Sequence, residues 1–176
     1  MNRILAALVV FVFIGLMVLY VREFPVFDNT IGIKILIFGS LAVGLILSIA
    51  LLILLRKRLV PLDNHLPEIF SIVFAFLIFS PLFGSLFNRL GASESVERSF
   101  IFEQEKPFKM GGFGWTTFIQ NRPTAMGWQL FVNDGERKRY RFRYEKQAYF
   151  PLTKSGEVIL LPLKTGLFGF PIIDLK

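Results

Sequence analysis

The stretch that decides the fold is IGIKILIFGSLAVGLILSIALLILL, which runs from Ile31 to Leu55. Two further apolar runs, Ile4–Val21 and Ile69–Phe87, precede and follow it. A helix needs about 20 apolar residues to cross a hydrocarbon core about 30 Å thick. Because short polar breaks at Arg22–Thr30 and Arg56–Glu68 separate the three runs, the sequence predicts a membrane protein with three transmembrane α-helices.

Composition supports this class. The chain has 176 residues, 53% of them hydrophobic, and a mean hydropathy of +0.57, which is too apolar for an ordinary soluble domain. Polar residues are concentrated in the second half, so we expect a three-helix transmembrane anchor over residues 1–90 and a separate domain over residues 91–176. The absence of cysteine excludes disulfides, thiolate metal sites and cysteine nucleophiles.

Basic residues near the ends of the apolar runs set the expected orientation, because such residues favour the cytoplasmic side of a membrane. Arg3 precedes the first run, and Arg56, Lys57 and Arg58 follow the second. We therefore expect a cytoplasmic N-terminus and an extracytoplasmic C-terminal domain, in the bacterial inner (plasma) membrane. The first run ends in bulky residues rather than a small-residue cleavage site, so we expect a retained helix and not a signal peptide.

Small residues follow one face of the second run. Ser40, Gly44 and Ser48 recur every four residues, which places them on the same side of a helix. Small side chains let another helix approach closely, so this face is predicted to pack within the anchor or against another membrane protein. Lys34 lies one turn into the same run, and we expect it to reach the lipid headgroups or to pair with Asp28.

After residue 91 the hydrophobic pattern changes from a helical period to an alternating one. Asp134-Gly135 lies between two strand-like runs and is typical of a tight hairpin turn, which needs positive φ. A second hairpin is predicted around Thr153–Gly156. We expect a small antiparallel all-β domain, either a sandwich or a partly open barrel. The predicted strands are Ser99–Glu103, Thr116–Gln120, Trp128–Val132, Lys138–Lys146, Ala148–Leu152, Glu157–Leu161 and Gly166–Leu175.

One predicted strand carries a basic face. Arg139, Arg141 and Arg143 alternate with aromatic residues, and Arg137 and Lys138 lie just before them. In a strand such alternate residues point to the same side. This face is either simply solvated or a contact for an acidic partner or an anionic lipid. We do not expect nucleic acid as a partner, because the domain is predicted to lie outside the cytoplasm.

A glycine-rich segment, Met110–Trp115, contains and follows aromatic residues. Phe108, Phe113 and Trp115 are predicted either to belong to a turn or to insert into the interface of the lipid bilayer, which aromatic side chains favour. The segment does not match a dinucleotide-binding motif, because no helix follows it to receive a phosphate.

The chain offers little for catalysis. Its single histidine, His65, lies in the segment Asp63–Glu68, where an Asp-x-His-x-x-Glu spacing resembles a metal-ligand set but is also typical of a capped helix start. We therefore expect no enzyme activity, no metal and no cofactor. The sequence favours a non-enzymatic membrane subunit or scaffold of a larger envelope complex. The alternative is a membrane-anchored sensing module that binds an anionic ligand, a lipid headgroup or an acidic partner through the basic strand.

Overall fold

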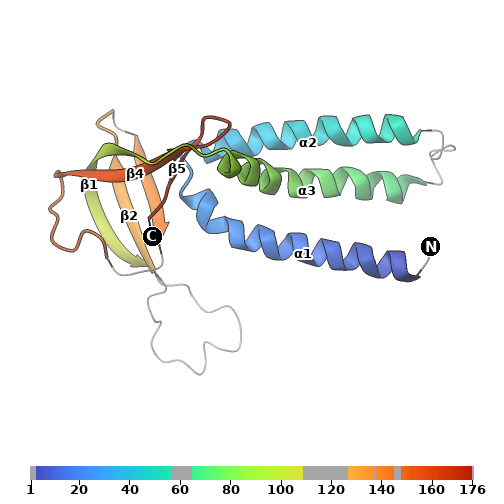
Figure 1. Ribbon diagram of the computed structural model, residues 1–176, viewed down its shortest axis with the longest axis horizontal. Coiled ribbons are helices and arrows are strands. Elements are labelled where there is room, and N and C mark those ends of the chain that lie inside the picture. Colours follow the sequence, from blue (N-terminus) through green and yellow to red (C-terminus); the bar gives the residue numbers. More distant parts are fainter. Residues whose placement is uncertain (1–2, 57–64, 109–126, 137, 145–147, 176) are drawn as a thin grey trace, which may run out of the picture. The chain divides into compact units, whose positions relative to one another are not determined.

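The computed structural model describes residues 3–56, 65–108, 127–136, 138–144 and 148–175 (Figure 1). In this part of the chain three α-helices, α1 (Arg3–Asp28), α2 (Ile33–Leu55) and α3 (Leu66–Leu90), are followed by five β-strands. All three helices are long and apolar enough to cross a membrane. The chain divides into a helical unit, residues 1–27, 32–92 and 166–170, and a strand unit, residues 28–31, 93–165 and 171–176.

The polar break predicted at Arg22–Thr30 is wrong over most of its length. Helix α1 continues to Asp28, so that only residues 29–32 separate it from α2. Phe24, Val26 and Phe27 continue the apolar pattern past the two charged residues, and a charged residue does not end a helix when its side chain finds a partner. As a result Glu23, expected in a loop, lies within α1.

The start of α3 also differs in detail from the prediction. Pro67 lies in the first turn and Glu68 near the positive end of the helix, as expected. The N-cap residue is His65, whose side chain makes no capping hydrogen bond, while Asp63 and Asn64 lie outside the described residues. His65 Nδ1 lies 3.8 Å from Glu68 Oε1. Among the described residues no group of three histidine or acidic side chains is arranged to hold a metal ion.

Helices α2 and α3 pack closely through small residues. A Cβ atom added to Gly44 of α2 would lie 2.7 Å from Ser80 Cβ and 2.9 Å from the Phe76 carbonyl oxygen of α3. In the reverse direction, a Cβ atom added to Gly84 of α3 would collide with the Ser40 side chain. Each glycine therefore receives a serine of the other helix, which brings the two backbones close together.

The strand unit is a single antiparallel sheet that curls into a half-barrel (Figure 1). The predicted fold class, three apolar helices followed by a small antiparallel β domain, is confirmed, and its β domain is a partly open barrel. The strand order is β3-β2-β1-β4-β5. The strands are β1 (Val96–Phe108), β2 (Gly127–Asn133), β3 (Arg139–Tyr144), β4 (Val158–Thr165) and β5 (Pro171–Ile173).

Strand β1 holds the half-barrel together. Its first half, Val96–Ile101, pairs with β4, and its second half, Ile101–Phe108, pairs with β2. The register shifts between Phe102 and Gln104, and such a bulge bends and twists a strand. Alternate residues of the strands fill the concave side as one hydrophobic core, formed by Phe100, Phe102, Leu130, Val132, Phe142, Tyr144, Ile159, Leu161, Leu163 and Ile173.

The first predicted hairpin is confirmed, and the second is wrong. Strands β2 and β3 pair across the turn at Asp134-Gly135, where Gly135 has φ of 84°. In contrast, Ala148–Leu152 forms no strand, because β4 takes β1 as its partner. The Glu105 carboxylate instead accepts hydrogen bonds from the backbone N–H groups of Tyr149 and Phe150. The predicted strand at residues 116–120 lies outside the described residues.

Candidate functional site

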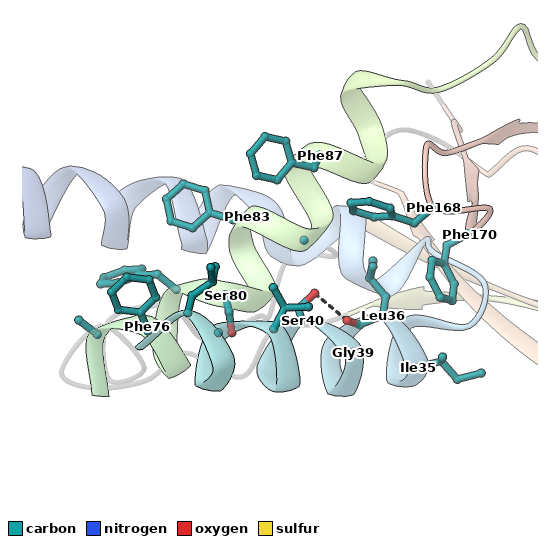
Figure 2. A pocket seen from close by; sticks show the side chains of 16 residues that line it. Ile35, Leu36, Gly39, Ser40, Phe76, Ser80, Phe83, Phe87, Phe168 and Phe170 are labelled. Atoms are coloured by element: carbon teal, nitrogen blue, oxygen red, sulfur yellow. Dashed lines mark hydrogen bonds between the residues drawn. The ribbon is translucent and has the colours of Figure 1, made fainter. Parts of the chain in front are cut away.

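A groove of about 670 Å³ lies along α2 and α3 in the helical unit (Figure 2). Phe76, Phe83 and Phe87 of α3 line it, and Phe168 and Phe170 line one end. The rest of the lining is almost wholly apolar. The groove therefore offers a hydrocarbon-like surface with a row of aromatic rings.

The serine hydroxyl groups in the groove already donate hydrogen bonds to backbone carbonyl oxygens. Ser40 Oγ donates a hydrogen bond to the Leu36 carbonyl oxygen at 2.7 Å, and Ser80 Oγ donates to the Leu77 carbonyl oxygen at 3.2 Å. Both hydroxyls thus return to their own helix. Gly39 also lines the groove, and a Cβ atom added there would meet nothing within 4 Å. The open space at Gly39 and the occupied hydroxyls suit an apolar occupant.

The predicted small-residue face of α2 is divided between two roles. Ser40 and Gly44 line the groove and meet α3 directly. Ser48 is fully buried, and its Oγ donates to the Leu45 carbonyl oxygen. The face therefore packs within the helical unit, which was one of the two interpretations drawn from the sequence.

Asn88 fixes the segment that carries Phe168 and Phe170. This buried side chain accepts a hydrogen bond from Phe168 N at 3.1 Å and donates one to the Phe170 carbonyl oxygen at 3.0 Å. The backbone carbonyl oxygen of Asn88 accepts a third hydrogen bond, from Leu167 N. Gly166 leaves the space that the Asn88 side chain fills. Asn88, near the end of α3, thus holds Phe168 and Phe170 at one end of the groove. The alternating pattern along residues 166–175 predicted a strand and did not indicate this contact.

Glu23 is the buried acid that the sequence reasoning missed. Its side chain lies within α1, with the residue only 3% exposed. Glu23 Oε1 accepts a hydrogen bond from Ser85 Oγ at 2.8 Å, and Oε2 lies 3.3 Å from Arg89 Nη2. A buried carboxylate is costly unless it is paired and hydrogen-bonded, so these contacts tie α1 to α3. The unbroken apolar pattern beyond Glu23 was the signal that could have placed it in a helix.

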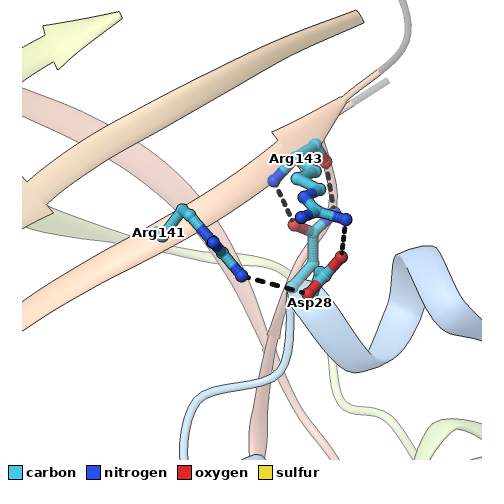
Figure 3. Close-up of polar contacts among 4 residues, drawn as sticks. Asp28, Arg141 and Arg143 are labelled. Carbon is cyan, nitrogen blue, oxygen red and sulfur yellow. Dashed lines mark hydrogen bonds and ion pairs between the residues drawn. The ribbon is translucent and has the colours of Figure 1, made fainter. Parts of the chain in front are cut away.

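The predicted basic face is present on β3, but its arginines have carboxylate partners in the strand unit. Figure 3 shows two of them, Arg141 and Arg143, beside Asp28. Arg143 Nη1 lies 2.7 Å from Asp28 Oδ2, and Arg141 Nη2 lies 3.8 Å from Asp28 Oδ1. Arg139 Nε lies 3.0 Å from Glu103 Oε1. Asp28 thus pairs with two arginines distant in sequence, and among the described residues it forms no ion pair with Lys34, the predicted partner.

The other predicted contact residues are only partly described. Lys138 precedes β3 and its backbone N–H donates to Asp134 Oδ1, while Arg137 lies outside the described residues. Phe108 packs its ring 4.6 Å from the Arg143 guanidinium carbon, in a cation–π contact. Phe113 and Trp115 lie outside the described residues. Phe108 therefore has a packing role within the strand unit.

Comparison of the chain with protein-family models, with curated proteins and with solved structures finds no match.

Proposed function

We propose that this protein is a non-enzymatic membrane subunit that assembles with other membrane proteins and receives a partner's transmembrane helix in the α2–α3 groove. The groove carries the proposal. It is apolar, it has an open position at Gly39, and its described lining comes from α2, α3 and the segment 166–170 without a contribution from α1.

Helix association in a bilayer supports this occupant. Lipid chains are as apolar as helix side chains, so helices associate through close packing and not through a hydrophobic driving force. Gly39 lets a partner backbone approach, and the rings of Phe76, Phe83 and Phe87 offer a large contact area. A partner side chain that fills this groove gains packing contacts that flexible lipid chains make less well.

The half-barrel would act as the part of the subunit that makes contacts outside the cytoplasm. The basic residues after α2 support this orientation, because such residues favour the cytoplasmic side. It is tested by an impermeant thiol reagent applied to intact cells, since the chain has no cysteine of its own. Lys154→Cys should be labelled and Arg56→Cys should not; the reverse pattern would place the half-barrel in the cytoplasm.

The alternative function, recognition of an anionic ligand by the basic strand, has weaker support. Arg139, Arg141 and Arg143 already pair with Glu103 or Asp28, so an external anion would have to displace these carboxylates. Arg139 is the most exposed of the three, with 79% of its side chain accessible, and such surface pairs exchange at little cost. Arg139 would therefore be the first contact of any such ligand.

A photo-crosslinking amino acid tests the groove directly. We would place it at Val43, which lines the groove and is 55% exposed, or at Ile46, which is 65% exposed but outside the groove. The proposal predicts a discrete protein adduct from Val43 and only lipid adducts from Ile46. Lipid adducts alone at both positions would overturn it.

A second variant separates partner binding from internal packing. Gly39→Leu should place a side chain in the groove without a clash at its Cβ, because no atom lies within 4 Å of a Cβ added there. We expect this variant to insert and fold normally but to lose the Val43 adduct. Retention of the adduct would show that the partner does not enter the groove.

A further inference from the structure

Residues 28–31, from the last residue of α1 to the residue before Gly32, do more than connect two helices. We name residues 28–31 the strap; they belong to the strand unit. On the β3 side, the Asn29 side-chain amide donates to the Arg143 carbonyl oxygen and accepts from Arg143 N, both at 2.7 Å. This pair of bonds imitates one rung of a β-ladder.

The same residues pair with the opposite edge of the sheet. Ile173 N donates to the Asn29 carbonyl oxygen at 2.9 Å, Ile31 N donates to the Pro171 carbonyl oxygen at 2.8 Å, and Thr30 forms a β-bridge with Ile172. Strands β3 and β5 are the two edges of the half-barrel. The strap thus bridges both edges and closes the gap between them.

The strap is nearly continuous in sequence with both helices. Asp28 is at once the last residue of α1 and the partner of Arg141 and Arg143. At the other end only Gly32 separates Ile31 from α2, with φ of 79°. A displacement of α1 therefore reaches the strap through the backbone at Asp28.

The closed arrangement also leaves one polar atom unsatisfied. Arg143 Nε is buried and has no hydrogen-bond partner among the described residues. A buried donor without a partner costs free energy that exposure to water returns. A movement that exposes Arg143 Nε to water would recover this free energy, so the unsatisfied donor makes the closed arrangement less stable than it would otherwise be.

We propose that the strap couples the membrane helices to the half-barrel, so that displacement of α1 opens the half-barrel between β3 and β5. Glu23 holds α1 to α3 through Ser85 and Arg89, five residues before the strap. Loss of that anchor frees α1 and should loosen the strap. The inference needs no partner protein and stands independently of the proposed function.

Hydrogen exchange of the full chain in lipid nanodiscs tests the coupling. Glu23→Gln should raise exchange in β3 and β5 by about tenfold or more and leave the central β1–β4 ladder unchanged, because edge strands open locally. Ser85→Ala, a milder change at the same anchor, should give a smaller rise at the same two strands. The matched control is Glu103→Gln, which removes the partner of Arg139 on the same sheet and should leave β5 unaffected.

An engineered disulfide between the strap and β5 should reverse the effect of Glu23→Gln on hydrogen exchange. Thr30 and Ile172 form a bridge flanked by two hydrogen bonds, the type of antiparallel pair whose Cα atoms lie close enough for a disulfide. In Thr30→Cys/Ile172→Cys protein, the effect of Glu23→Gln on β5 should vanish when oxidised and return on reduction. Unchanged exchange at both edges in reduced Glu23→Gln and Ser85→Ala protein, or an equal rise in every strand, would overturn the proposal.

Discussion

Replacing Gly44 with alanine should separate α2 from α3, whereas the same replacement at Gly39 should not. At Gly44 the new Cβ would lie 2.7 Å from Ser80 Cβ. Carbon atoms normally approach to roughly 3.5–4.0 Å, so the helices must move apart by roughly 1 Å. Overpacking of this kind costs about 1–3 kcal/mol. Alanine favours a helix over glycine by roughly 0.5–1 kcal/mol, a gain common to both positions, so the difference between the two variants isolates the contact.

The assay follows the distance between the two helices. Donor and acceptor dyes on cysteines introduced at Phe38 and Leu90, which are 70% and 80% exposed, report separation of α2 from α3 as the fraction of denaturing detergent in mixed micelles increases. We expect Gly44→Ala to lose energy transfer at a lower detergent fraction than the parent and Gly39→Ala to match or exceed it. Equal midpoints for the two variants would refute the packing argument.

Three further predictions concern the half-barrel, each measured by thermal unfolding of the full chain through tryptophan fluorescence. Phe142→Ala should lower the free energy of unfolding by about 3–5 kcal/mol, because Phe142 is 2% exposed in the core. The control Arg141→Ala should lower it by less than about 1 kcal/mol. Equal losses in the two variants would contradict the assigned core. Gly135→Val should cost roughly 1–2 kcal/mol because φ is 84°, and an unchanged transition would argue against the turn. Desolvation raises the pKa of Asp134, but hydrogen bonds from backbone N–H groups and the Tyr140 hydroxyl outweigh it and hold this pKa below 3.8. The stability from Asp134 should therefore be present above pH about 4 and lost as the pH falls through the lowered pKa, so Asp134→Asn should be less stable than the parent at pH 7 and equal to it in strong acid.

Local signals in the sequence predicted the parts of this fold that depend on neighbouring residues. Apolar length is enough for the three helices, and the turn at Asp134-Gly135 with its flanking alternation is enough for the β2–β3 hairpin. The pairing of β4 depends on a partner about 60 residues away. The sequence therefore predicted strand character at Glu157–Leu161 correctly but assigned the wrong neighbour, Ala148–Leu152.

The candidate site was predictable only where it is periodic. The spacing of Ser40, Gly44 and Ser48 indicated a packing face, and the alternation at Arg139, Arg141 and Arg143 indicated an arginine face. The groove depends on Phe168 and Phe170, which Asn88 brings to α3 from 80 residues away. No pattern within a single segment carries that information. Glu23 was misplaced for a related reason, since its partners Ser85 and Arg89 lie on another helix.

The strap also sets an order for the synthesis of the protein. Residues 28–31 leave the ribosome early, while their partners at Pro171–Ile173 are made about 140 residues later. Until then one edge of the nascent sheet stays open, and exposed edges are the places where strands pair wrongly or aggregate. A chain cut short before residue 171 would keep β1 to β4 and all three helices yet would lack the closing contact. Such a product should be cleaved faster than the full chain in limited proteolysis, because its sheet edge stays open.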